Sequence, residues 1–415
     1  MTATTRFTVA LDLAKHTHVA TIFDSHSGQA DETTTIAITK QGFADFEKLL
    51  TSYSGDPHDF LIGCEATGHY GETLLWRLQK DGYPIVRLNP SQVVQFRRGL
   101  GRRAKTDALD ADAMARQLSV MTPVPEVRLD DTALRLQRLT RLRLDFVEEQ
   151  NRWISRARAL LNQICPEIEA FFKDLTASSS LKLLTRYPSR RDLAEAPLDE
   201  MTEIARKSSH GVRNRDFAKQ LQTLARSSVG LDDPWLGDEL RIVLRQLSGI
   251  VDTVKQLECA ISSSTDEYLM RHSKMSGLAR PLTRDDFPLQ SDLSLGTLLG
   301  EIGTIQRFAS LKHLLSFFGW CPQTQESGTT SNPHPAMSPR GNRFARRILF
   351  MQAICAVRCV PEYHDYFAAR VSAGKSKMKT LIAVARKILS AIFAILRTGQ
   401  PYDRQQYMKH KPLAT

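Results

Sequence analysis

One short apolar run decides the fold: Phe7-Thr-Val-Ala-Leu-Asp-Leu13. Its β-branched and apolar residues favour a strand. A second run, Val19 to Phe23, follows a polar bend at residues 15–18, and a third covers Thr33 to Ile38. Because only short polar segments separate the runs, the sequence predicts three consecutive antiparallel strands.

The segments that follow alternate between helical and strand patterns. Residues 42–50 favour a helix, and Phe60 to Cys64 is a short apolar strand that ends at Glu65. After these come an amphipathic helix through Leu74, Leu75 and Leu78, a strand at residues 83–88, and a helix that begins near Ser91. The resulting order, βββαβαβα, is that of an RNase H-like fold, an α/β domain whose mixed sheet is flanked by helices.

Four acidic residues fall where this order would gather them. Asp12 lies in the first strand, Glu65 ends the fourth, and Asp107 and Asp110 belong to a predicted helix. Residues three apart on a helix lie side by side, whereas Asp112 is turned away from this pair. An Asp-rich first turn favoured by the helix dipole is the alternative reading of Asp107 and Asp110.

A metal site is favoured because the buried strand residue Asp12 needs a partner. Removing a carboxylate from water without compensation is costly, and a divalent cation is the usual remedy for several close carboxylates. Hard oxygen ligands suit Mg²⁺, with Mn²⁺ as the alternative. Two such ions would support phosphodiester chemistry, one at the attacking oxygen and one at the leaving oxygen.

Two basic segments predict contacts with nucleic acid. The first combines glycines with five cations, and glycine lets a backbone approach a phosphate closely; the cations are Arg97, Arg98, Arg102, Arg103 and Lys105. The second opens a predicted helix at residues 343–357, where the dipole disfavours cations; its members are Arg340, Arg343, Arg346 and Arg347. A solvated loop is the alternative for the first segment.

Composition agrees with a polyanionic partner. The chain has 415 residues, enough for two or three domains, and 56 Lys and Arg against 45 Asp and Glu give a net charge of +11. No signal peptide and no apolar run of membrane-spanning length are found, so we expect a cytoplasmic protein without a membrane partner. The six scattered cysteines are expected to be buried free thiols, because Cys355 and Cys359 lack a second pair for zinc.

From Asp131 the pattern predicts a long helix that stops or kinks at Pro166. An apolar near-heptad seam follows it, formed by Leu139, Leu142, Phe146, Trp153, Ala157, Leu160 and Ile164. The seam favours a coiled coil, either in a dimer or with residues 247–261 of the same chain. Residues 176–280 could be assigned no chemistry.

Two blocks of motifs carry a family resemblance. Residues 6–120 contain Asp12, Glu65 and Lys105-Thr-Asp-Ala-Leu-Asp110. The second block, at about residues 290–360, contains Leu298-Leu-Gly-Glu-Ile-Gly303, Phe318-Gly-Trp-Cys-Pro322, Glu326-Ser-Gly328 and Ser338-Pro-Arg-Gly-Asn-Arg343. Together they resemble the DEDD transposases of bacterial insertion sequences, whose recombination is directed by a bridge RNA. At residues 287–293 the chain departs from the Gly-x-Gly hairpin of that family.

The resemblance implies a RuvC-type domain, like that of Holliday-junction resolvases, in which Asp12, Glu65, Asp107 and Asp110 bind Mg²⁺. It also implies a serine nucleophile, matched here by Ser327, that forms a covalent phosphoserine intermediate with DNA; Ser338 is the rival. Members work as RNA-bound dimers that pair into tetramers, and the bridge RNA base-pairs with donor and target DNA.

The resemblance gives a three-part organisation. It comprises a metal-binding RNase H-like domain at 1–125, a helical coiled-coil region at 126–280 and a mainly helical transposase domain at 281–415. Two other functions stay open. One is a nuclease that hydrolyses DNA junctions with water and does not use the serine, and the other is a non-catalytic nucleic-acid-binding protein.

Overall fold

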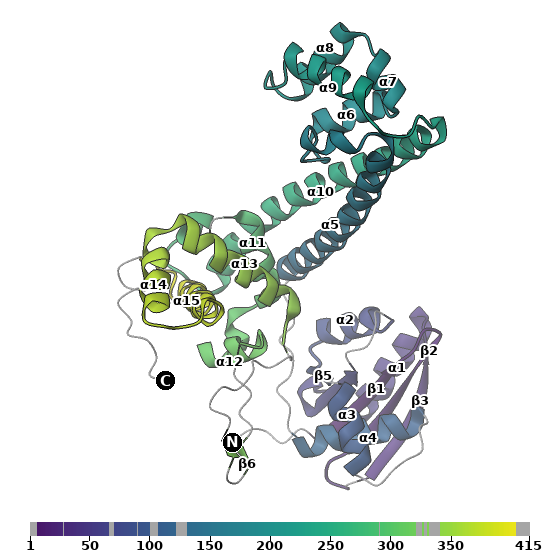
Figure 1. The fold of residues 1–415 in the computed structure, drawn as a ribbon. Helices are drawn as coiled ribbons and strands as arrows, with labels where there is room; N and C mark the ends of the chain where they lie inside the picture. Colours follow the sequence, from purple (N-terminus) through teal and green to yellow (C-terminus); the bar gives the residue numbers. More distant parts are fainter. Residues whose placement is uncertain are drawn as a thin grey trace. The chain divides into compact units, whose positions relative to one another are not determined.

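The computed structural model describes residues 6–27, 29–65, 70–88, 90–99, 107–121, 131–289, 291–320, 326–327, 330–331 and 341–403. The chain forms two compact units, Met1–Arg128 and Leu129–Thr415, which are described separately (Figure 1). The first unit is mixed α/β and the second is mostly helical in its described residues. The finer division at residues 125 and 280 stays a prediction.

The first unit is built on a five-stranded mixed sheet in the order β3-β2-β1-β4-β5. Its strands are β1 (Phe7–Leu13), β2 (Thr17–Asp24), β3 (Gln29–Ala37), β4 (Phe60–Glu65) and β5 (Ile85–Leu88). β2 pairs antiparallel with β1 and β3, whereas β4 pairs parallel with β1 and β5. The three predicted antiparallel strands and the mixed sheet are therefore confirmed.

Three helices complete the predicted order βββαβαβα: α1 (Lys40–Tyr53), α2 (Glu72–Lys80) and α3 (Pro90–Gly99). The predicted helix with Asp107 and Asp110 follows as α4 (Asp107–Met121). The core on one face of the sheet joins Val9 and Leu11 to Phe46 of α1 and Leu74 of α2. The other face carries a second core that includes Ala10 and is covered by α4 and part of α3. The sheet is thus sandwiched between helices (Figure 1).

The predicted polar bend at residues 15–18 is wrong in its second half. Thr17 and His18 already belong to β2, and His18 is fully buried beside Phe43, with 6.3 Å between the ring centroids. Burial lowers the pKa of His18, so the imidazole stays neutral. A neutral imidazole can occupy an apolar position, which is why the polar pattern misplaced the start of the strand.

Two long helices dominate the second unit. α5 (Asp131–Ile164) and α10 (Pro234–Met275) run antiparallel in the same chain, because Arg135 pairs with Glu267 and Arg143 with Glu258. Pairing within the chain, one of the two predicted alternatives, is therefore what the structure contains. α5 ends before Pro166, as expected.

The predicted seam of α5 is only partly correct. Leu142 is 45% exposed, whereas Leu136, Thr140 and Leu144 are buried. The buried positions shift because a second helix, α11 (Asp292–Ile302), also packs on this part of α5. Contacts on two sides replace the single stripe that a two-stranded coiled coil would need.

A helical cluster packs against the C-terminal end of α5 and the N-terminal end of α10. It consists of the 3₁₀ turn η2 (Pro166–Ala170), α6 (Ser178–Arg186), α7 (Arg190–Glu195), α8 (Leu198–Ser208) and α9 (Arg215–Ser227). Its core joins Phe172 and Leu221 to Leu161 of α5 and Leu244 of α10. The helices α6 to α9 lie in the stretch 176–280, for which the sequence indicated no function, and they help to form a core of their own.

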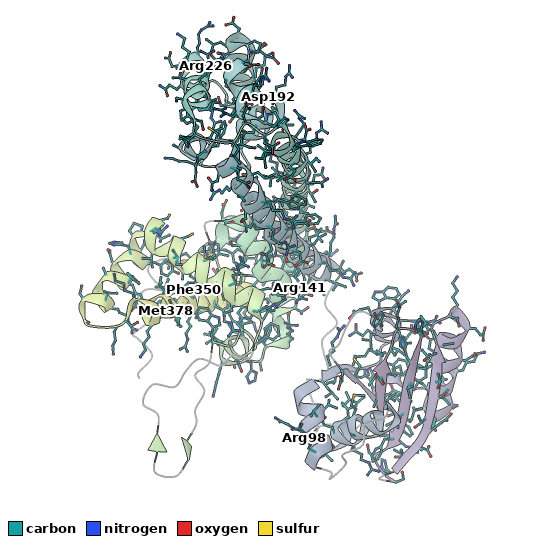
Figure 2. All side chains as sticks on the ribbon, turned by 45° about the vertical axis from the view of Figure 1, so that its right-hand side comes forward. Arg98, Arg141, Asp192, Arg226, Phe350 and Met378 are labelled. Atoms are coloured by element: carbon teal, nitrogen blue, oxygen red, sulfur yellow. The ribbon has the colours of Figure 1, made fainter. Side chains whose placement is uncertain are left out.

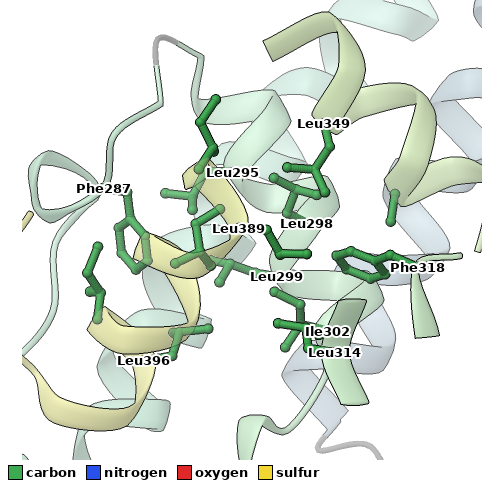
Figure 3. Close-up of a cluster of buried hydrophobic side chains, with 14 of the residues drawn as sticks. Phe287, Leu295, Leu298, Leu299, Ile302, Leu314, Phe318, Leu349, Leu389 and Leu396 are labelled. Atoms are coloured by element: carbon green, nitrogen blue, oxygen red, sulfur yellow. The ribbon is translucent and has the colours of Figure 1, made fainter. Parts of the chain in front are cut away.

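The other end of α5 belongs to a C-terminal core (Figure 3). Besides α11 it contains α12 (Leu311–Phe317), α13 (Arg343–Cys359), α14 (Pro361–Ser372) and α15 (Lys377–Thr398), with the 3₁₀ turns η3 (Arg284–Asp286) and η4 (Ile305–Arg307). Figure 3 shows Leu298 and Ile302 of α11 between Phe318 and the leucines of α15. Phe287, where the resembled family has a glycine hairpin, is buried in the same core.

The cysteine prediction is partly wrong. Cys64 and Cys165 are buried free thiols, but Cys259 and Cys359 are exposed on helices. Within the described part of the chain, no helix is both long and apolar enough to cross a membrane.

Candidate functional site

Asp12 and Glu65 lie at neighbouring strand ends. The parallel pairing of β1 with β4 runs from Phe7 opposite Phe60 to Leu11 opposite Cys64, and the two acids follow directly. Leu11 and Cys64 point into the core under α1 and α2. Because side chains alternate along a strand, Asp12 and Glu65 belong to the opposite face. Both are half-buried.

That opposite face is the one covered by α4. The hydroxyl of Thr8 donates a hydrogen bond of 3.2 Å to the carbonyl of Ala115, and a Cβ at Gly63 would lie 2.4 Å from Leu118. Glycine at position 63 therefore lets the helix pack directly on β4. The structure brings together on one face the two acidic strand ends and the helix that carries the other two predicted acids.

Asp107 is the first residue of α4 and Asp110 follows one turn later. Their side chains lie outside the described part of the structure, so convergence of all four carboxylates stays a prediction. Among the described residues no group of three or more His, Cys, Asp or Glu side chains could hold a metal ion. Asp12 and Glu65 supply carboxylate oxygens, the donor type that fits Mg²⁺.

The first basic segment is described only at its start. Arg98 is exposed near the end of α3 (Figure 2). Arg97 precedes it in the same helix, but its side chain is not among those described. Arg102, Arg103 and Lys105 also lie outside the described residues, and their role in binding stays a prediction.

Ser327 belongs to β6 (Glu326–Ser327), which pairs antiparallel with β7 (Thr330–Ser331). Its backbone lies opposite Thr330. The surroundings of its side chain, together with Ser338 and Arg340, are outside the described residues. The assignment of the nucleophile therefore stays a prediction.

The second unit contains a buried carboxylate, Glu301, to which the sequence motifs assigned no role. Glu301 of α11 is fully buried and accepts hydrogen bonds from the Nε and Nη2 atoms of Arg141 at 2.7 and 2.9 Å. Gln137 donates to it at 3.2 Å, and the Asn342 amide donates as well. A buried charge is tolerated only with such full compensation.

Asn342 connects this network to α13. Its Oδ1 caps the helix by accepting from the backbone N–H groups of Phe344 and Ala345, and its own N–H donates to the carbonyl of Phe317 at 3.0 Å. Gly341 has φ +119° and leaves no room for a Cβ against Gly319. The chain is thus fixed at the point where residues 321–340 lead into α13.

The second basic cluster opens α13. Arg343 and Arg347 are exposed, Arg346 is half-buried, and all three line one pocket. Arg347 pairs with Glu148 at 3.4 Å, although both side chains remain more than half exposed. An exposed pair of this kind contributes little and leaves the cation accessible.

Comparison with protein families gives two matches. Residues 9–166 match a family described as Transposase, and residues 291–368 match one described as Transposase IS116/IS110/IS902 family. The chain belongs to the IS110/IS116 transposase family. Transposases of this family are enzymes that act on DNA.

Relatives in the family span most of the chain. The Insertion element IS110 uncharacterized 43.6 kDa protein of Streptomyces coelicolor is 28% identical over 304 residues, 72% of either chain. The Insertion element IS116 uncharacterized 44.8 kDa protein of Streptomyces clavuligerus is 25% identical over 341 residues, 80% of this chain and 81% of its own. The Pilin gene-inverting protein of Moraxella lacunata is 21% identical over 398 residues, 96% and 98% of the two chains.

Proposed function

We propose that this transposase is an RNA-guided, Mg²⁺-dependent recombinase that cuts and rejoins DNA through a phosphoserine at Ser327. The observation that carries the proposal is the position of Asp12 and Glu65 at neighbouring strand ends, on the sheet face covered by α4. Asp107 and Asp110 at the start of that helix complete the proposed ligand set.

The four carboxylates would hold Mg²⁺, or Mn²⁺, through oxygen atoms alone. When bound, the ion supplies Lewis-acid polarisation of a phosphodiester and stabilisation of the leaving oxygen. The half-burial of Asp12 and Glu65 supports this role, because it leaves both carboxylates within reach of solvent ions while limiting competing hydration.

In the proposed reaction the Ser327 oxygen attacks the phosphorus of one DNA strand. A serine–phosphate bond forms as the serine hydroxyl loses its proton, the bond from phosphorus to a sugar oxygen breaks, and that oxygen gains a proton and leaves as a hydroxyl, so that no net proton is consumed. Attack by the hydroxyl of another strand reverses the step, which rejoins DNA and releases serine. No bond energy is lost to water, so strands can be exchanged without another energy source.

Rejoining is favoured over simple hydrolysis by one relative. The Moraxella lacunata protein is named for inverting a pilin gene, and inversion requires cut strands to be joined again. By analogy, the present chain is proposed to exchange strands instead of degrading junctions.

Sequence choice is assigned to a bridge RNA that pairs with donor and target DNA, as in the family that the sequence resembles. A protein that delegates base reading to RNA needs mainly backbone contacts, and exposed arginines such as Arg98 and Arg343 suit that task. Dimers that pair into a tetramer on DNA are part of the same proposal.

Covalent trapping tests the proposal. Full-length protein is incubated with end-labelled DNA, Mg²⁺ and its co-purified RNA, then separated under denaturing conditions. We expect a protein–DNA adduct that Ser327→Ala abolishes and Ser338→Ala retains. Strand cleavage that survives in Ser327→Ala would identify the protein as a nuclease that uses water, and activity that persists after ribonuclease treatment would reject RNA guidance.

A further inference from the structure

A pocket of 380 Å³ opens beside the first turns of α13. Its lining comes from α13 and α15 and from one residue that follows α12. The lining residues are Arg343, Arg346, Arg347 and Phe350 of α13, Met378 and Ile382 of α15, and Trp320. Figure 2 places Phe350 and Met378 beside each other. The volume is at the lower end of the range of small-molecule sites, about 300–1,000 Å³, and suits a single small planar group with its substituent.

The rim of this pocket is cationic. Arg343 is exposed, and no ion pair of Arg343 is found within the described part of the chain. Exposed Lys377 and Lys379, which flank Met378 at the start of α15, add positive charge. The acidic side chain Glu148 reaches this rim, where it forms a weak, exposed ion pair with Arg347. The rim therefore suits an anionic group.

The floor of the pocket is apolar and partly aromatic. Phe350 is half-buried, Met378 is 55% exposed, and Ile382 packs against the C-terminal core. Trp320 is 3% exposed, and its indole N–H has no hydrogen-bond acceptor among the residues that the structure describes. A buried donor without an acceptor is costly in an isolated protein and would be satisfied by an oxygen or nitrogen of a ligand.

A cationic rim over an aromatic floor is the arrangement that binds unpaired nucleotides, whose phosphate is anionic and whose base has two flat apolar faces. We propose that this pocket binds one unpaired nucleotide of a DNA strand, with the base against Phe350 and Met378 and the phosphate between Arg343 and Arg346. The inference rests on the proposed function, because exchange of strands requires bases to leave their partners.

DNA is favoured over RNA as the occupant for two reasons. The family acts on DNA. In addition, none of the described lining residues is a carboxylate, amide or hydroxyl side chain that would accept from a ribose 2′-OH, so a deoxynucleotide loses no such hydrogen bond there.

Binding of matched oligonucleotides tests the inference. The probe is a DNA duplex with one bulged 2-aminopurine, compared with the same duplex in which this base is paired with thymine. Full-length protein is titrated at fixed salt in EDTA, so no strand is cut. We expect the bulged duplex to bind about tenfold more tightly and its fluorescence to be quenched by stacking.

Two variants and one control separate the pocket from general DNA binding. Phe350→Ala should remove the preference for the bulge, a loss of about tenfold, while affinity for the paired duplex stays unchanged. Arg343→Gln should weaken binding of the bulged duplex and lower its salt slope by about 0.9. Arg358→Gln, on an exposed position of the same helix outside the pocket, should match the wild type.

Three results would overturn the inference. The first is equal affinity of the wild type for bulged and paired duplexes, and the second is an unchanged preference in Phe350→Ala with intact melting behaviour. The third is tighter binding of the bulged ribonucleotide than of the deoxyribonucleotide, since the occupant would then be RNA. Because the assay needs neither metal nor cleavage, its failure is distinguishable from loss of the Ser327 adduct, which tests the proposed function alone.

Discussion

The carboxylates of the two units lie in contrasting environments. Asp12 and Glu65 of the first unit are half-buried where two parallel strands end, whereas Glu301 of the second is fully buried among donors from α5 and α13. The charge of Glu301 is satisfied by the protein itself, so this residue stabilises the fold. Carboxylates at half-exposed strand ends remain within reach of ions from solution. Burial, more than residue type, thus separates the structural acid Glu301 from the candidate catalytic acids.

The largest expected effect comes from the strand-end acids. Asp12→Asn keeps the size of the side chain but removes a charged ligand, so strand exchange should fall by at least about a hundredfold. Folding should be unaffected, and addition of Mg²⁺ should raise the melting temperature of the wild type more than that of the variant. Recombination assays and thermal melting measure both effects. Undiminished recombination would reject the metal assignment.

The features that the sequence predicted correctly depend on residues that are close together in the chain, and those that it did not predict depend on residues far apart. The strands and the place of Asp12 and Glu65 follow from short apolar and β-branched runs, and parallel pairing of β1 with β4 then brings the two acids to one edge. Glu301 and Arg141 are 160 residues apart in the sequence, so neither residue predicts its pairing with the other. One signal was present, because Gly300 precedes Glu301 and a Cβ there would lie 2.7 Å from the backbone of Gln137.

Long-range packing also explains the error in the α5 seam. A heptad pattern assumes one partner helix, whereas α5 meets both α10 and α11, which leaves Leu142 exposed. The convergence of Asp107 and Asp110 with the strand-end acids, and the choice of Ser327, still rest on sequence.

A smaller effect is expected when the buried carboxylate of the second unit is left without its cation. Arg141→Met removes the bidentate donor, and the uncompensated charge of Glu301 should destabilise this unit by about 3 kcal/mol. Urea unfolding followed by tryptophan fluorescence measures the loss. Arg135→Met, which breaks the exposed pair with Glu267, is the matched control on the same helix and should cost less than about 1 kcal/mol.

Restoring neutrality sharpens this test. The double variant Arg141→Met, Glu301→Gln removes both charges, so it should recover part of the lost stability. If Arg141→Met were no more destabilising than Arg135→Met, Glu301 would not be held in the way the hydrogen bonds indicate, and its contrast with the strand-end acids would disappear.

The smallest effect concerns a buried histidine side chain, His272, in the second unit. His272 is buried on α10, stacks on Tyr268 and lies 2.9 Å from the carbonyl of Leu396, and burial lowers its pKa below the ordinary value of 6.5. The unfolded chain therefore binds a proton near pH 6.5 that the folded chain binds only at lower pH. Stability from this residue is complete above that pH and is lost as the pH falls toward the folded pKa.

His272→Phe keeps the aromatic stacking and removes the titration. The variant should be less stable than the wild type at pH 8 because the hydrogen bond with Leu396 is lost, but its melting temperature should fall less steeply between about pH 7 and pH 5. Equal slopes for His272→Phe and the wild type would mean that His272 becomes charged inside the fold. The second unit would then contain a charged, buried His272 that its described partners do not compensate. A buried charge would therefore not require compensation, and the distinction between Glu301 and Asp12 would also fail.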